Sequence, residues 1–299
     1  MAEARPGAAC PQRQVGRVTH RLSTPSTAHR DGVELAQQLL ARMVRVSHRI
    51  GFMESDQCHH LATVGAGEIA DISEAWERRA RDWIAWTRTP ELDTYHWQLN
   101  LPALAPLVPP AGRLTLDIGC GEGRVGRWLA DAGHRVWGVD SSPTLTAHAV
   151  QAGGYDVVVC GTATELPWPD GCADLAVAFM SLHDMPDPSV AITEIARTLE
   201  PGGVLCIAIV HPLNRPAEGL QEYFTERRSC SSVSRGGLTM TLEVIDRPLE
   251  SYTRALAAAG LVIEELREPR ADARAVGRAP ELAPAARQPF FLHLRCRRT

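Results

Sequence analysis

The stretch LTLDIGCGEGRVGRWLA, residues 114–130, places a short apolar run directly before three closely spaced glycines and an amphipathic segment. A short apolar run is typical of a buried strand, and Val125, Trp128 and Leu129 share one face of a helix. The stretch therefore predicts a strand, a tight glycine turn and a helix. More than one class of α/β protein uses this arrangement to hold a ligand that contains adenosine.

Residues 113–299 continue this alternation of strand-like and helix-like patterns. One predicted helix begins at Pro143, a second begins at Pro188 with Asp187 as its cap, and a third ends at Gly260. Alternation of this kind predicts a parallel sheet covered by helices on both faces. The predicted strands are 114–118, 134–140, 156–160, 173–180, 204–210, 261–268 and 288–297.

The connection between the last two predicted strands decides how the final strand pairs. It is roughly 20 residues long, rich in Ala, Arg and Pro, and no periodic helix fills it. Because a parallel pair needs a crossover, usually a helix, we expect the final strand to pair antiparallel beside its predecessor. Such a strand is not a feature of the fold built from two dinucleotide-binding halves.

Two carboxylates distinguish between the possible ligands of the glycine turn. Gly121, Gly123 and Gly126 fit the G-x-G-x-x-G pattern of dinucleotide sites, which alone is weak evidence. Asp117 precedes the turn and would repel a pyrophosphate, whereas it would attract the ammonium and sulfonium groups of S-adenosylmethionine. Asp140 ends the second predicted strand and can accept hydrogen bonds from both ribose hydroxyls. The alternative is that both aspartates only cap the turns that follow them.

Four stretches resemble, in order, the motifs of class I S-adenosylmethionine-dependent methyltransferases of the small-molecule type, which includes quinone-biosynthesis enzymes. They are LDIGCGEGRVGRWLA, VWGVDSSPTL, TATELPWPDGCADLAVAFMSLHDM and EIARTLEPGGVLCIAIVHPLN, and the resemblance covers about residues 72–299. It implies a Rossmann-like α/β fold with helices on both faces of a seven-stranded sheet. The implied strand order is 3-2-1-4-5-7-6 with strand 7 antiparallel, and the implied activity is methyl transfer from S-adenosyl-L-methionine.

The resemblance also implies which residues hold this cofactor. They are, in chain order, Asp117, Gly119, Cys120, Gly121, Gly123, Asp140, Ser141, Thr162, Ala163 and Met180. Asp117 and the Gly119 backbone would hold the methionine end, and Asp140 would hold the ribose. Thr162 departs from the family pattern, which often has Asp there, so its contact with the adenine amine would be uncharged.

Candidate groups for the acceptor follow the fourth and fifth predicted strands, where ligands bind in such sheets. His183 and Asp184 lie in SLHDM, and His211 lies in IVHPLN. Because a histidine can take a proton near neutral pH, His183 and His211 are the candidate general bases or acceptor-positioning residues. The alternative is that each histidine only lines a pocket or holds a loop.

The residues before the sheet predict a lid. Residues 72–89 form an amphipathic helical pattern with Trp76 and Trp83, and a second short helix follows within 92–110. Aromatic faces attract cations, so these tryptophans, with Tyr95 and Trp97, are candidates to cover the sulfonium or the acceptor. We expect a disordered or non-globular extension over 1–65, a helical lid over 66–110 and the methyltransferase domain over 111–299. Residues 238–248 alternate apolar and polar, which predicts an extra edge strand over the site.

Composition excludes several classes of function. All 31 basic residues are arginines, so a Schiff-base or P-loop lysine is impossible. The net charge of −4 gives no basis for binding nucleic acid, and no apolar run is long enough to cross a membrane. The eight cysteines form no C-x-x-C pair, which argues against a metal cluster and favours reduced thiols in the cytoplasm. The expected partner is a small-molecule acceptor.

Two alternative functions remain open at this point. A nicotinamide-dependent dehydrogenase predicts a helix between the last two strands and no role for Asp117. A relative that binds the cofactor without turnover predicts a closed acceptor pocket.

Overall fold

The computed structural model describes residues 72–215 and 217–299, without the side chains of residues 217 and 218. The extension expected over residues 1–65 lies outside the described part of the chain. Within the described ranges, no helix has the length and apolar composition needed to span a bilayer.

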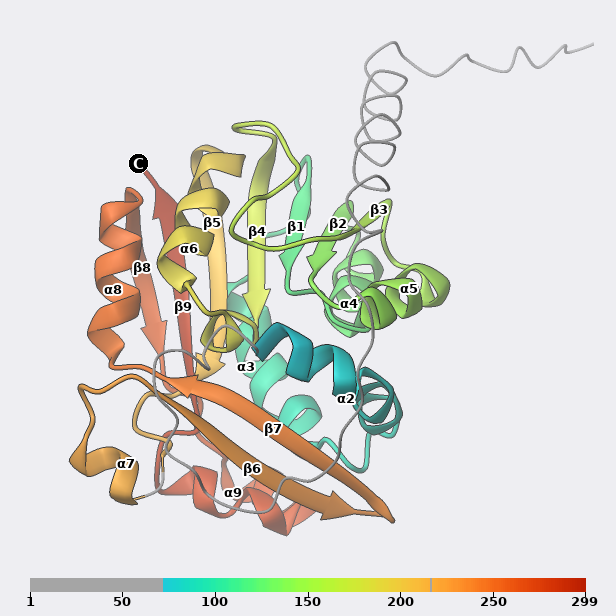
Figure 1. Ribbon diagram of the computed structural model, residues 1–299, viewed down its shortest axis with the longest axis vertical. Helices are drawn as coiled ribbons and strands as arrows, with labels where there is room; N and C mark the ends of the chain where they lie inside the picture. The colour runs from blue at the N-terminus through green and yellow to red at the C-terminus, as the bar shows by residue number, and fades with distance from the viewer. Residues whose placement is uncertain (1–71, 216) are drawn as a thin grey trace, which may run out of the picture. The chain divides into compact units, whose positions relative to one another are not determined.

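A seven-stranded mixed sheet carries the fold, in the order β3-β2-β1-β4-β5-β9-β8 (Figure 1). The five strands that pair in parallel are β1 (Thr115–Ile118), β2 (Val136–Asp140), β3 (Val157–Cys160), β4 (Ala173–Phe179) and β5 (Leu199–Val210). Strand β9 (Phe291–Arg298) lies antiparallel between β5 and β8 (Leu261–Arg267). The expected order, with the last strand inserted antiparallel, is confirmed.

Successive side chains of the central strands point to opposite faces of the sheet, and both faces are buried. On β5, Leu205, Ile207 and Ile209 belong to the core under α6 (Pro188–Thr198) and α8 (Leu249–Ala258). The intervening Val204, Cys206 and Ala208 belong to the core under α3 (Leu101–Leu104) and α4 (Arg124–Asp131). Helix α5 (Pro143–Ala152) packs beside β3 and β2.

The predicted helix starts at the two prolines are confirmed, and side chains cap both helices. The Ser142 hydroxyl accepts a hydrogen bond from the Leu145 N–H at 3.1 Å at the start of α5. Asp187 Oδ1 accepts from the N–H groups of Ser189 and Val190 at 3.0 and 3.1 Å at the start of α6. Proline fits the first helical position because its missing N–H would have no helical partner there.

Two connections differ from the sequence prediction. Strand β5 begins at Leu199, directly after α6, and runs through the PGG segment that was expected only to end the helix. The connection from β8 to β9 contains a short helix, α9 (Ala273–Arg278), and two 3₁₀ turns. The prediction that no helix lies there was wrong, because six residues are too few to show a helical period. Asp272 starts α9 by accepting a hydrogen bond from the Ala275 N–H at 2.6 Å.

Helical segments and a hairpin lie at the end of the sheet toward which β4 points (Figure 1). The helical segments are α2 (Ile72–Thr87), a π-helix (His96–Asn100), α3 and a 3₁₀ turn (Ala105–Leu107). The hairpin consists of β6 (Arg227–Arg235) and β7 (Leu238–Asp246), and it follows α7 (Ala217–Gln221). The strand expected near 238–248 exists, but it pairs with β6 in a separate sheet rather than on the edge of the main one.

The hairpin and α2 share a small apolar core. Trp86, Leu92 and Met240 are buried together, and Trp76 and Trp83 pack against them. Glu77 ties the same helix to the start of α5, where Thr144 Oγ1 donates a hydrogen bond to Glu77 Oε1 at 2.5 Å. Helix α2 is therefore held from both sides above the sheet end.

Candidate functional site

A pocket of about 300 Å³ lies at the carboxyl ends of the first four parallel strands. Its walls come from the turn after β1, the end of β2, the loops after β3 and β4, and helix α2. Apart from Asp117 and Gly123, every residue expected to hold the cofactor lines this pocket: Gly119, Cys120, Gly121, Asp140, Ser141, Thr162, Ala163 and Met180. Trp76 and Trp83 also line it, whereas Tyr95 and Trp97 do not.

The three glycines of the turn all have positive φ, at 73° for Gly119, 54° for Gly121 and 94° for Gly123. A Cβ on Gly119 would lie 2.4 Å from the Ser181 Cβ, so this glycine allows the turn to pack on the loop after β4. A Cβ on Gly121 would meet only Trp83 Nε1, at 3.8 Å. Gly121 therefore exposes backbone to the pocket, where a ligand can approach closely.

Asp140 fastens the turn to β2. Its Oδ2 accepts a hydrogen bond from the Gly121 N–H at 2.9 Å, and its Oδ1 accepts one from the Ser142 N–H at 2.9 Å. Burial raises the pKa of Asp140, and the nearby Glu77 also raises it, while these hydrogen bonds oppose the shift. Each carboxylate oxygen has a second lone pair, so Asp140 can still accept hydrogen bonds from a ligand.

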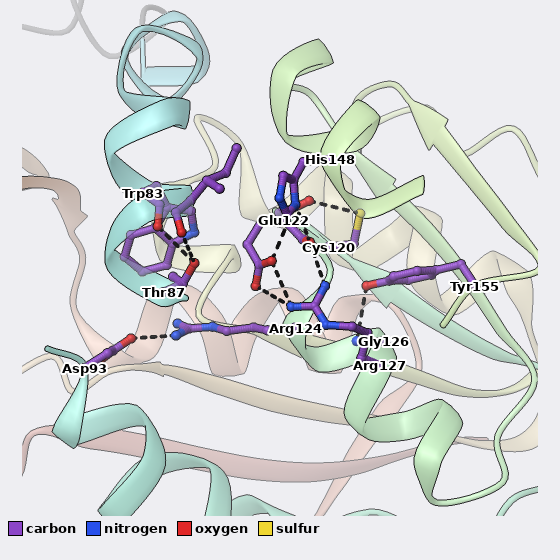
Figure 2. Close-up of polar contacts among 12 residues, drawn as sticks. Trp83, Thr87, Asp93, Cys120, Glu122, Arg124, Gly126, Arg127, His148 and Tyr155 are labelled. Carbon is purple, nitrogen blue, oxygen red and sulfur yellow. Dashed lines mark hydrogen bonds and ion pairs between the residues drawn. The ribbon is translucent and has the colours of Figure 1, made fainter. Parts of the chain in front are cut away.

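Asp117 lies beneath the turn and is absent from the pocket wall. Its Oδ2 accepts a hydrogen bond from the Tyr155 hydroxyl at 2.7 Å. The same hydroxyl accepts one from the Gly126 N–H at 3.1 Å (Figure 2). The Tyr155 ring occupies the space that a Cβ on Gly126 would need, since that atom would lie 2.0 Å from Tyr155 Cζ. Asp117 is therefore enclosed by the strand and by Tyr155, and its expected contact with the methionine end of the cofactor stays a prediction.

Arg124 connects the turn to the lid at the wall of the pocket. Its guanidinium lies 5.0 Å from the centre of the Trp83 ring, and its Nη1 donates to Asp93 Oδ2 at 2.5 Å (Figure 2). Beside it, Glu122 lines the pocket but is neutralised by Arg127, whose Nη2 donates to both Glu122 carboxylate oxygens at 2.9 and 2.8 Å. The sequence analysis missed Arg124 and Glu122, although both lie within the glycine motif.

The loop after β3 forms the far wall. Ser141, Thr162 and Ala163 line it, and the Thr162 and Thr164 hydroxyls lie 2.9 Å apart within hydrogen-bonding distance. Ala163 also packs against the core under α6. This wall offers hydroxyl groups and no carboxylate.

The family model described as a methyltransferase domain matches residues 116–207. A probable S-adenosylmethionine-dependent methyltransferase of Mycolicibacterium smegmatis is 35% identical over 98 residues, which are 33% of this chain and 38% of that protein. The 2-methyl-6-phytyl-1,4-hydroquinone methyltransferase of a Synechocystis strain is 36% identical over 103 residues, which are 33% of this chain and 32% of that protein. The matches therefore span about two fifths of these relatives or less.

The crystal structure of an S-adenosylmethionine-dependent methyltransferase from Mesorhizobium loti superposes with a TM-score of 0.55 at 25% identity, covering 66% of this chain and 96% of that one. The chain contains a class I S-adenosylmethionine-dependent methyltransferase domain. The resemblance based on the four motifs is thereby confirmed. Domains of this family use S-adenosylmethionine as their methyl donor.

Neither candidate histidine lines the pocket of the methyltransferase domain. Burial, aided by the nearby Arg247 charge, lowers the pKa of His183 to about 3. His211 Nδ1 accepts a hydrogen bond from the Leu213 N–H at 3.0 Å, and its Nε2 lies 2.8 Å from Glu268 Oε1. His211 therefore holds the segment after β5. The roles expected for His183 and His211 stay predictions, and their positions outside this pocket do not support them.

Asp184 is the side chain of the SLHDM segment that lines the pocket. Trp76 donates a hydrogen bond to this carboxyl group, and burial raises its pKa well above the usual range. Its Oδ1 atom makes no hydrogen bond to any described residue, and His183 Nε2 lies 3.4 Å from it. A buried, unpaired acceptor atom at this place can receive a hydrogen bond from a ligand.

The floor of the pocket carries backbone strain. Met180 has φ of 55°, and it is the only described residue other than glycine with positive φ. Its N–H donates to the Ala208 carbonyl at 2.7 Å, and the next residue, Ser181, donates from its hydroxyl to the Ile118 carbonyl at 2.6 Å. These bonds to β5 and β1 hold the strained residue in place.

Replacing Gly119 by Ala should destabilise the domain by about 2 kcal/mol more than replacing Gly202 by Ala. Both glycines have positive φ, at 73° and 82°, so each variant pays about 1–2 kcal/mol for that conformation. Only Gly119 also brings its new Cβ against Ser181, since nothing lies within 4 Å of a Cβ on Gly202. Urea unfolding of the two variants measures the difference, and equal losses would contradict it.

The buried carboxyl of Asp117 should make stability fall as the pH rises from 5 to 7. Burial raises the pKa of Asp117 from 3.8 to about 7, so in this window the folded state binds more protons than the unfolded state. The free energy of unfolding then falls by up to about 1.4 kcal/mol per pH unit. Asp117→Asn removes this contribution, so urea unfolding at pH 5 and pH 7 should show a shallower decline for the variant. Parallel pH profiles would contradict the assignment.

Proposed function

We propose that this chain transfers the methyl group of S-adenosylmethionine to a small-molecule acceptor. The observation that carries the proposal is the single pocket at the strand ends that joins the glycine turn, Asp140 and the tryptophans of α2. One relative of the matched segment is named as a methyltransferase of 2-methyl-6-phytyl-1,4-hydroquinone, a small molecule.

The residues of the pocket fit this cofactor. Gly121 leaves room for close approach, and Asp140 keeps free lone pairs for two ribose hydroxyls. Ser141, Thr162 and Ala163 would bracket the adenine, and Met180 lies on the floor of the pocket. The ionisable side chains on the wall are the carboxyl groups of Glu122, Asp140, Asp184 and Asp187 and the guanidinium of Arg124. Glu122 is paired with Arg127 and Arg124 with Asp93, which among the described residues leaves only carboxyl groups without an arginine partner on the wall. This excess of carboxyl groups favours a cation, so the residues that line the pocket, rather than Asp117, would attract the positively charged cofactor.

Bound S-adenosylmethionine supplies a methyl group on a positively charged sulfur, and the chain has to align an acceptor with it. Holding the two reactants in line can lower the barrier by about 7–11 kcal/mol. Trp76 and Trp83 cover the pocket from α2, and Trp83 is itself fixed by Arg124. Because α2 is joined to β7 through a buried core, it is held in place over the pocket.

Asp184 would hold the acceptor. Phe179, Met180 and Met185 surround it on the loop after β4, so this part of the wall is apolar apart from the carboxyl group. When Asp184 is ionised, an acceptor with an O–H or N–H can donate to its Oδ1 and pass its proton there, and the raised pKa makes this carboxylate a stronger base than an exposed one. A general base of this kind contributes about 10²–10⁴-fold to the rate.

The features expected to identify a dehydrogenase do not separate the two enzyme classes. Helix α9 lies between the last two strands, and Asp117 does not reach the pocket, as that alternative required. The antiparallel β9 between β5 and β8 and the matching family model argue for the methyltransferase instead. A binding protein without turnover would have a closed acceptor side, whereas here Asp184 and Met185 line the same pocket as Asp140.

Two measurements test the proposed function. Calorimetry with S-adenosylmethionine, S-adenosylhomocysteine, NAD⁺ and NADH should show binding of the first two only. Incubation with S-adenosylmethionine labelled in the methyl group and a metabolite extract should then label a small molecule. Binding of NADH alone would refute the proposal, and binding of S-adenosylmethionine without any labelled product would favour the relative without turnover.

A further inference from the structure

A second cavity contains three side chains with buried nitrogen atoms that lack partners. It has a volume of only about 10 Å³ and lies between the segment after β5, strand β7 and helix α8. Arg215, Arg247 and His183 line it and are 9%, 2% and 4% exposed. Arg215 Nε, Arg247 Nη1 and His183 Nδ1 make no hydrogen bond to any described residue. Because buried polar atoms are nearly always hydrogen-bonded, the cavity is the place for a common partner.

The rest of each guanidinium is fixed by the backbone. Arg247 Nη2 donates to the carbonyl oxygens of Met185 and Pro186 at 2.8 and 2.9 Å. Arg215 Nη1 donates to the Tyr223 carbonyl at 3.1 Å, and its Nη2 donates to the Arg247 carbonyl. The orientations of both arginines are therefore set without help from the unpaired nitrogens.

The charges around the cavity do not balance. Arg215 has no carboxylate within ion-pair distance among the described residues, and Arg247 Nε pairs at 3.3 Å with Glu226, whose side chain is 44% exposed. Asp246 also lines the cavity, but its Oδ2 is bonded to Arg227 Nε at 3.3 Å. Among the described residues, carboxylates thus pair with Arg247 and Arg227, whereas the guanidinium of Arg215 lies 4.8 Å from the centre of the Tyr223 ring. A buried charge without a counterion is strongly destabilising.

We propose that this cavity binds one monatomic anion, chloride in the cell, between Arg215 Nε and Arg247 Nη1. Its volume admits one particle the size of a water molecule and excludes phosphate or a carboxylate. The remaining wall consists mostly of Val210, Pro212, Val244 and Ile245, which suits a weakly hydrated halide. A water molecule would satisfy the hydrogen bonds but, unlike an anion, would bring no negative charge to Arg215.

The anion would stabilise the segments around the pocket and would take no part in the reaction, so the inference is independent of the proposed function. Arg247 holds the Met185 and Pro186 carbonyls next to Asp184, and Arg215 belongs to the segment after β5. The anion would hold these two segments together. We therefore expect halides to raise the thermal stability of the protein.

Thermal unfolding at matched ionic strength gives the first test. Sodium bromide and sodium chloride should raise Tm by about 2–4 °C relative to sodium gluconate, whose anion is too large for the cavity. Arg215→Met should abolish this difference. The matched control is Arg254→Met, because Arg254 is an exposed residue of α8 paired with Glu250, and it should leave the difference intact. A halide effect that survives in Arg215→Met would overturn the proposal.

Crystals of the full chain grown in sodium bromide give the second test, which needs no variant. An anomalous difference peak between Arg215 Nε and Arg247 Nη1 is expected at the bromine edge. Density without anomalous signal at this place would show that water fills the cavity and would overturn the proposal, even if Arg215→Met does not fold.

Discussion

Asp140→Asn is expected to raise the dissociation constant for S-adenosylhomocysteine about 100-fold. The carboxylate of Asp140 accepts the Gly121 and Ser142 N–H groups and keeps two lone pairs for a ribose diol. Hydrogen bonds to a charged group contribute about 1.5–3 kcal/mol each, and 1.4 kcal/mol corresponds to a factor of ten in affinity. The amide of Asn has the same shape, but its NH₂ group would face one of the two backbone donors. Isothermal titration calorimetry measures the change.

Asp156→Asn is the matched control for this variant. Asp156 directly precedes β3 and forms an exposed pair with Arg135, with Nε and Oδ2 2.5 Å apart. Its replacement removes the same charge from the same half of the sheet, but at a distance from the pocket wall. The control should bind S-adenosylhomocysteine as the unaltered protein does. Binding by Asp140→Asn within threefold of the control would contradict the role given to Asp140.

The strand order and the helix starts could be predicted because they depend on local sequence. The apolar strands alternate with helices, and the starts at Pro143 and Pro188 are visible from the prolines themselves. The hairpin strand β6 was not predicted because RRSCSSVSR is polar and largely exposed, so no apolar period marks it. Helix α9 was missed because it is too short to show one.

The position of Asp117 could not be predicted from its place near the glycines. It is the third residue of β1, whose last residue is Ile118, whereas Asp140 is the last residue of β2. A side chain within a strand lies under the turn, and one at the strand end reaches the pocket. The partner of Asp117, Tyr155, is 38 residues away, and no local pattern connects the two.

The roles of His183 and Asp184 could not be separated from the sequence because they are neighbours. They lie in a 3₁₀ turn, Leu182–Asp184, in which successive side chains point about 120° apart. Asp184 faces the large pocket, and His183 lines the small cavity. Only the phase of the turn, which is set by tertiary packing, decides which is which.

Because Asp184 faces the large pocket, Asp184→Asn should lower kcat by about 10²–10⁴-fold. The variant keeps the size of the side chain but cannot take a proton from the acceptor. Binding of S-adenosylhomocysteine should change by less than threefold, because the residues expected to hold it lie mainly on the turn, β2 and the loop after β3. The rate is measured with the small molecule that becomes labelled in the extract experiment.

His211→Gln is the control that distinguishes the carboxylate from a histidine base. His211 holds Leu213 and Glu268 outside the pocket, so its replacement should lower stability while leaving kcat and its pH profile unchanged. A histidine base would instead show a large loss in this variant and none in Asp184→Asn. Full activity of Asp184→Asn would mean that the acceptor loses its proton to solvent or has none to lose, as in methylation of a tertiary amine. Because calorimetry follows cofactor binding separately, that outcome would remove the role of Asp184 and leave the assignment of the domain intact.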